Sequence, residues 1–212
     1  MKTRLMTIVL IFTLTSNIIA LDFMGPPMST INLGQLNHGF EITYNEMDLD
    51  ATISLGDVDV DGTLENVKTN RYFGRLGLGV FDGVEVFGRA GGIGLDIQDS
   101  GIDIDDVYTF AYGYGVKATV FESDNLILGG LFSMTRIDFD AEQFSITGVV
   151  GKIDYTEMQI AAGPTLVIGN IDIYGGPFMH IIEGDMELVQ GATTVTADID
   201  EKSTVGGYGG IA

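Results

Sequence analysis

The chain has 212 residues, 45% of them hydrophobic, and 30 acidic residues against 10 basic ones give it a formal net charge of −20. This charge excludes nucleic acid as an expected partner, because phosphates attract Lys and Arg, and the lack of cysteine in the sequence excludes a disulfide framework. So acidic a chain is usually poor in hydrophobic residues and disordered, but a mean hydropathy of +0.28 indicates that the charges are segregated from the apolar segments.

Residues 1–20 have the features of a secretory signal peptide. Lys2 and Arg4 supply a positive n-region, residues 5–14 form an apolar run of h-region length, and Ala20 is a small residue at a suitable cleavage position. We therefore expect an exported protein with a periplasmic N-terminal segment at 21–34 and a folded unit at 35–212. An exported chain without cysteine fits a bacterial envelope better than a small secreted eukaryotic domain.

An alternation of apolar and polar residues with period two begins at residue 35. In "QLNHGFEITYNE" (35–46) the even positions are mainly apolar and the odd positions mainly polar, which predicts a strand with one apolar face. The strand exceeds the usual length of about five or six residues and reaches the roughly 9–11 residues that cross a bilayer. The same pattern predicts strands at 71–80, 107–120 and 157–168, glycine-rich strands at 84–96, 126–138 and 171–183, and the start of another at 203–212.

The connections between these strands alternate in length. Residues 82–83, 122–125 and 169–170 have the composition of tight hairpin turns. Long connections are expected at about 47–66, 96–106, 139–153 and 184–202, and the four stretches around them hold 23 of the 30 acidic residues. Short turns at one rim and long loops at the other are typical of an antiparallel up-and-down transmembrane β-barrel.

These features resemble bacterial eight-stranded outer-membrane barrels of the OmpA-transmembrane or OmpW-like kind. The resemblance is architectural and covers about residues 33–212, with no short diagnostic motif. It implies residence in a Gram-negative outer membrane, contact with its lipid and lipopolysaccharide, insertion by the barrel-assembly machinery, and long loops outside the cell. The chain departs from this family by ending on Ala212 and not on an aromatic residue, so the eighth strand is expected to be truncated or followed by more strands.

Charged residues within the predicted strands lie on the polar face and indicate an inward network. Its expected members are Glu41, Arg71, Arg75, Lys117 and Glu157, with Arg89 a less certain one. A lipid-facing Lys or Arg near mid-bilayer costs about 2–4 kcal/mol, so these side chains are expected to point inward and to pair there. Eight strands leave an interior that side chains fill, which favours a plug over a pore.

The aromatic residues of the predicted strands suggest two interfacial girdles. Tyr44, Tyr72, Tyr108, Phe110 and Tyr155 are expected near the long-loop rim, and Phe81, Phe121 and Tyr174 near the short turns.

The stretch "GDVDVDG" (56–62) resembles the start of an EF-hand, but its twelfth position is Lys68 and not Glu, and strands flank it. The alternation predicts an exposed ribbon closed near Gly62. Asp57, Asp59 and Asp61 stay candidates for weak binding of divalent cations. We expect no cofactor and no enzyme activity, because the sequence holds no cysteine, only His38 and His180, and no catalytic or nucleotide-binding motif.

The expected function is therefore structural, or the display of acidic loops to an extracellular partner that the sequence does not identify. A porin-like channel for small solutes is the first alternative, should the barrel have more strands. A soluble, secreted all-β binding protein is the second, because β-sandwiches also alternate and use tight turns.

Overall fold

The computed structural model describes residues 25–55, 58–99, 102–139, 145–146, 149–190, 193–200 and 204–211. No described residue is helical, and no helix there is long and apolar enough to cross a membrane. The expected signal peptide at 1–20 lies outside the described residues. The strands are β1 (Leu36–Leu55), β2 (Val58–Phe81), β3 (Val84–Asp99), β4 (Ile102–Glu122), β5 (Leu126–Phe139), β6 (Ser145–Ile146), β7 (Val149–Ile168), β8 (Ile171–Gln190), β9 (Thr193–Asp200) and β10 (Thr204–Ile211).

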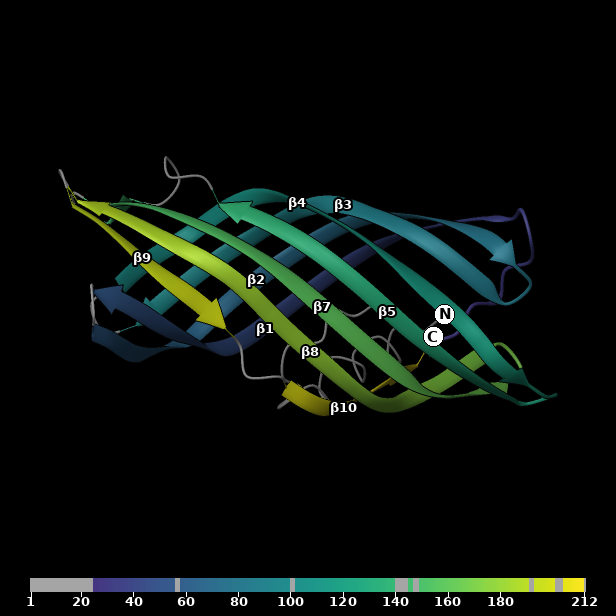
Figure 1. Cartoon of the computed structure of the whole chain (residues 1–212). Coiled ribbons are helices and arrows are strands. Elements are labelled where there is room, and N and C mark those ends of the chain that lie inside the picture. The colour runs from purple at the N-terminus through teal and green to yellow at the C-terminus, as the bar shows by residue number, and fades with distance from the viewer. Residues whose placement is uncertain are drawn as a thin grey trace, which may run out of the picture.

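The strands form one antiparallel up-and-down sheet that curls into a barrel-like wall (Figure 1). Each long strand pairs with its neighbours in the chain, and β9 pairs with both β8 and β1, which joins the two sides of the sheet. A path from each residue to its paired neighbour runs once around the ring and meets β1 again ten residues from where it began. This path passes through Phe40, Gly74, Ala90, Tyr112, Arg136, Thr156, Glu183, Asp200 and Asp50. This stagger tilts the strands steeply against the barrel axis.

The predicted strands and short turns are confirmed. At the short-turn end, β2 connects to β3 through Asp82 and Gly83, and β7 connects to β8 through Gly169 and Asn170. Gly83 and Gly169 have φ of 74° and 64°, a region in which a side chain is strained and glycine is not. The β2–β3 and β7–β8 turns therefore need glycine at these positions.

The prediction of long loops at the other end is wrong for most of their length. The expected connections at 47–66, 96–106 and 184–202 are largely strand, so that β1 and β2 pair up to Leu55 and Val58. Gly62, expected to close the ribbon, lies inside the ladder opposite Ala51. Paired ribbons thus extend the barrel where long loops were expected, and around Gly62 the alternation of valine and aspartate predicts such a ribbon.

Candidate functional site

The wall changes its polarity halfway along the strands. Near the short turns, the outer face of β5 carries Leu128 and Phe132, which are 39% and 37% exposed, while Ser133 and Thr135 are buried inside. Further along the same strand the order reverses: Arg136 and Asp138 point outward, and Ile137 and Phe139 are fully buried. The strand keeps its alternation, so the reversal lies in the sequence and not in a bulge.

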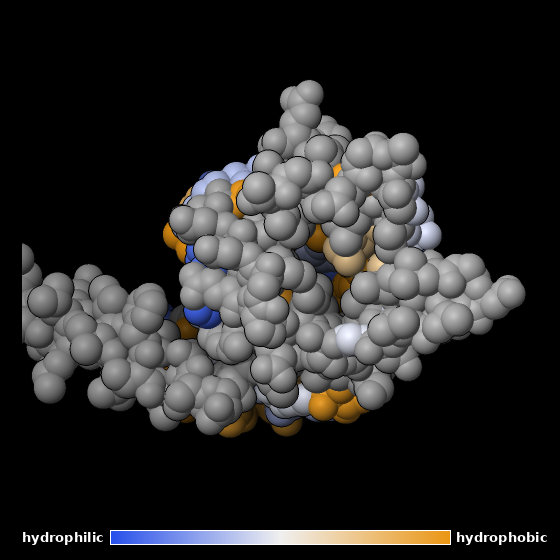
Figure 2. All heavy atoms as spheres, turned by 90° about the vertical axis from the view of Figure 1, so that its left-hand side faces the viewer, coloured by the Kyte–Doolittle hydropathy of each residue, from blue (hydrophilic) through white to orange (hydrophobic). Residues whose placement is uncertain are grey.

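The same reversal occurs at the matching level of the neighbouring strands. On β7 the outer face changes from Ile160 to Lys152, and on β8 from Ile173 to Glu183. Arg136, Thr156 and Glu183 lie opposite one another in the ladder, so the boundary follows one line across β5, β7 and β8. Figure 2 looks at the end where β1 and β2 meet and shows hydrophobic patches at the outer margin.

Beyond this boundary the inward side chains of β5 and β8 are mainly apolar. Twelve buried hydrophobic residues from β2, β3, β4, β5, β7, β8 and β9 form one cluster, which includes Phe73, Ile93, Phe139 and Ile182. Tyr155, expected in the outer girdle, packs against this cluster and stacks on Phe139. That expectation is wrong because odd positions of β7 face inward.

The charged residues predicted from the sequence lie on the inward faces of β1, β2, β4 and β7. Arg71, Lys117 and Glu157 are 0%, 3% and 1% exposed. The side chains of Arg75 and Glu41 are 12% and 11% exposed. Arg89, the less certain member, is also inward at 3%.

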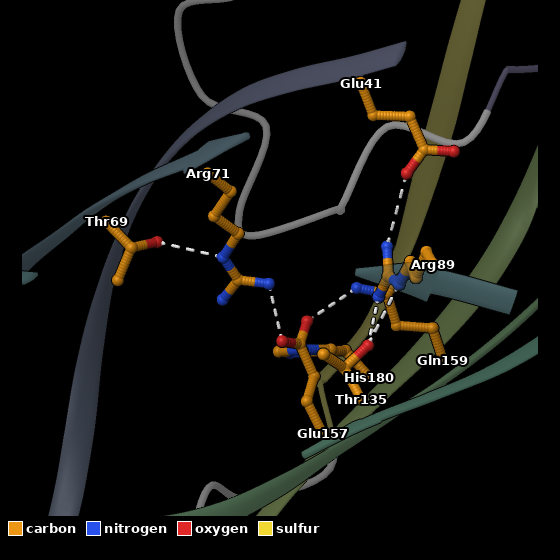
Figure 3. A network of polar contacts seen from close by, with 8 residues as sticks. All are labelled: Glu41, Thr69, Arg71, Arg89, Thr135, Glu157, Gln159 and His180. Carbon is orange, nitrogen blue, oxygen red and sulfur yellow. Dashed lines mark hydrogen bonds and ion pairs between the residues drawn. The ribbon is translucent and has the colours of Figure 1, made fainter. Parts of the chain in front are cut away.

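Glu157 lies at the centre of one part of this network (Figure 3). Its Oε2 is 2.5 Å from Nη1 of Arg71, which spans the interior from β2 to β7. Its Oε1 is 2.6 Å from Nε2 of His180 and accepts a 2.6 Å hydrogen bond from Gln159. Arg71 also donates from Nε to Thr69 over 3.2 Å. One buried carboxylate thus joins groups from β2, β7 and β8.

Arg89 and Arg75 form the second part of the network. Nη1 of Arg89 is 3.6 Å from Oε2 of Glu41, and its Nε donates to Thr135 over 3.1 Å. Arg75 lies 3.6 Å from both Glu41 and Glu85. The guanidinium carbons lie over aromatic rings, Arg75 at 5.3 Å from Phe87 and Arg89 at 4.8 Å from Phe73. These contacts join β1, β2, β3 and β5 across the interior.

Residues 26–34, which we call the strap, run along the inner wall at the short-turn end. Thr119 of β4 donates to the Ser29 carbonyl over 2.7 Å and accepts from the Ser29 amide over 3.3 Å. Nζ of Lys117 donates to the Pro26 carbonyl over 3.1 Å. Gly34 donates to Gly79 of β2 over 2.8 Å. The segment expected as a periplasmic extension therefore contributes, from residue 26 on, to the filling of the barrel.

Sequence reasoning missed five members of the network, among them Thr69 and Gln159, which lie two residues from Arg71 and Glu157. His180 and Thr135 lie on β8 and β5, whose alternation is obscured by glycines, and Glu85 lies close to a predicted turn. The register of β8 could have found His180, because Tyr174, Phe178, His180 and Ile182 share the inward face. Tyr174, expected in the lower girdle, is likewise inward at 4% exposure and lies beside Tyr208.

The candidates for cation binding, Asp57, Asp59 and Asp61, have no described side chains. Asp57 lies outside the described residues, and for Asp59 and Asp61 only the backbone, in β2, is described. Among the described side chains, no group of three or more His, Asp or Glu is placed to hold a metal ion.

The chain matches no protein-family model, and neither a curated protein nor a solved structure is significantly similar to it.

Proposed function

We propose that this protein is an outer-membrane β-barrel with a filled, ion-paired interior and a structural or surface-interaction role. The polarity of the wall carries the proposal. Where the strands leave the short turns, large apolar side chains cover the outside, and charged residues are buried inside. A soluble β-sandwich would bury the apolar face of each strand, whereas a lipid-facing wall exposes it.

The apolar wall has the dimensions of a bilayer crossing. Its outward positions on β5 run from Leu126 to Met134, nine residues or about 30 Å of strand. A tilt of about 35–45° reduces this to roughly 21–25 Å, close to the apolar band of about 25 Å in outer-membrane barrels. Exposed Phe81 and Phe121 lie at the short-turn edge of the band, and Tyr44, Tyr72, Tyr108 and Phe110 toward its other edge. These positions fit two aromatic girdles.

In this proposal the outer face contacts membrane lipid and lipopolysaccharide, and the barrel-assembly machinery inserts the chain after export by residues 1–20. The reversed section, with Arg136, Asp138 and Glu183 outward, then stands in water outside the cell. It would hold the acidic hairpins away from the membrane surface and present them to an extracellular partner.

The filling of the interior supports a plug over the porin-like alternative. The apolar cluster, the charged network and the strap follow one another along the inside of the wall. Eight-stranded barrels have just enough interior to hold their own side chains. We expect no stable single-channel conductance in planar bilayers; a steady conductance that Arg75→Ala alters would favour the channel.

Fractionation tests the location. The mature chain is expected in the outer-membrane fraction, with a faster gel mobility unboiled than boiled, because a folded barrel resists detergent. Recovery from the soluble periplasm, with the same gel mobility in the boiled and unboiled samples, would support the soluble binding protein and contradict the proposal.

A further inference from the structure

The two sides of the barrel are joined unevenly along their length. β9 pairs with β1 from Asp50 to Ser54 and with β8 from Glu183 to Gln190. β10 continues the same direction and pairs with β8 between Ile173 and His180. Among the described residues no ladder joins β10 to β1. The ladder between β1 and the last strand therefore stops at Asp50. The section of β1 between Asp50 and the short-turn end of the barrel has no ladder on that side.

The last strand gains one residue between β9 and β10. Glu183 lies opposite Asp200, and His180 lies opposite Thr204, so three steps on β8 match four on the last strand. This shift of register by one residue exchanges the inward and outward positions. The exposed positions agree: Asp198 is exposed on β9, whereas Val205 and Gly207 are exposed on β10.

We infer that β10 also pairs with β1 and closes the barrel along its whole length, with Gly209 opposite Ile42. The other outward pairs are Gly207 with Tyr44 and Ile211 with Phe40, and the same register places Val205 opposite Glu46. The β9–β1 ladder sets this register, because Asp200 lies opposite Asp50 and the extra residue moves each later partner by one. A barrel keeps one stagger along its length, and this register preserves the ten-residue stagger of the ring.

Side-chain direction supports the same register. Phe40, Ile42 and Tyr44 point outward and are 69%, 66% and 58% exposed. On β10 the odd positions point outward, so each of these three residues meets an outward partner. A slip of one residue would place outward side chains opposite inward ones, which strand geometry forbids.

Residue sizes match as well. Tyr44 would lie opposite Gly207, and large side chains already lie over a cross-strand glycine elsewhere in the barrel. Tyr108 covers Gly94, Phe87 covers Gly115, and Phe178 covers Gly206, with aromatic carbons 2.4–2.8 Å from where a Cβ would be. Such pairs let an aromatic ring shield a glycine backbone. The glycines of β10 thus fit the large side chains of β1.

We call the boundary between β1 and the last strand, from Asp50 toward the short turns, the seam. The strand that pairs with β1 along the seam is therefore the chain's own β10 and not a second copy. The inference rests on pairing and not on the membrane, so it holds for a soluble barrel too. Its consequence is that Tyr208 would lie opposite inward Thr43 and seal the charged network from the side. Within a bilayer, closure would also satisfy backbone groups that otherwise cost several kcal/mol each.

Disulfide trapping tests the register, because the native sequence has no cysteine. Three double variants share Ile42→Cys and add Gly207→Cys, Gly209→Cys or Ile211→Cys. We expect mild oxidation to join the 42–209 pair at least tenfold faster than the other two, since directly opposite residues have suitable Cα separations. The 42–72 pair, on the observed β1–β2 ladder, is the positive control.

Each other outcome overturns the inference. Faster trapping of 42–207 or 42–211 would assign another register, and a crosslinked dimer from Ile42→Cys alone would assign the seam to a second copy. Failure of 42–209 alongside successful 42–72 trapping would show an open seam. If the cysteine variants do not fold, amide exchange in the unmodified protein decides: closure protects all amides of residues 40–46, whereas an open seam leaves alternate ones fast.

Discussion

At the scale of single residues, the buried Glu157 is the group on which most of the interior depends. It contacts Arg71, His180 and Gln159, and all of these side chains are almost completely excluded from solvent. Buried charges contribute little net stability as a pair, but the loss of one partner leaves the other uncompensated. The network therefore specifies how β2, β7 and β8 face one another more than it adds stability.

Replacing Glu157 by Gln is expected to lower the free energy of unfolding by about 3–5 kcal/mol, because Arg71 loses its carboxylate partner. Reversible urea unfolding in lipid vesicles measures this change. Asp138→Asn is the matched control: it breaks an ion pair whose side chains are 56% and 45% exposed and is expected to cost under about 1 kcal/mol. Adding Arg71→Met to Glu157→Gln should recover much of the loss. Equal effects of the Glu157 and Asp138 variants would contradict this role.

At the scale of elements, the strap depends on a glycine in β5. A Cβ on inward Gly129 would lie 2.6 Å from the Cα of Met28, whereas a Cβ on outward Gly130 would be 3.7 Å from its nearest atom. The two glycines are neighbours in the same strand, so backbone effects on β5 itself are matched. They differ in whether the strap lies against them.

Gly129→Ala is expected to displace the strap, and Gly130→Ala is expected to leave it in place. We expect limited proteolysis within residues 26–34 to become about 10-fold faster in Gly129→Ala, which corresponds to about 1.4 kcal/mol less protection. Gly130→Ala should stay within about twofold of the unmodified protein. Equal cleavage rates in both variants would show that the strap does not pack against β5.

The sequence predicts the strands well and their ends poorly. Long alternating segments such as 35–46 and 107–120 predict the strand, its apolar face and its inward charged residues, because an alternation of period two is a local property of the sequence. The alternation around Gly62 predicts a ribbon but not where β1 ends and β2 begins, at Leu55 and Val58, since the ladder that stabilises it is formed by a partner strand. His180 and Glu85 join the network through register across the barrel, which no local pattern encodes.

At the scale of the whole molecule, the reversal of polarity divides the barrel into two sections of opposite design. On β5, β7 and β8, one section has an apolar outside, and the other has a charged outside with Ile137, Phe139 and Ile182 buried inside. The ring of pairings is continuous across the boundary at Arg136 and Glu183. A single up-and-down sheet can therefore suit lipid at one end and water at the other by changing residue types alone.

A charged substitution at outward position 132 distinguishes a lipid-facing wall from a water-facing one by the size of its effect on stability. In a bilayer, Phe132→Arg is expected to destabilise the barrel by about 2–4 kcal/mol, because the guanidinium enters hydrocarbon. In water the same change removes a phenyl ring that is 37% exposed and should alter stability by less than about 0.5 kcal/mol. Thr196→Arg, at an exposed position on β9 in the charged section, is the control and should be neutral in either case. Unfolding in vesicles measures both variants, and a neutral Phe132→Arg would place β5 outside the membrane.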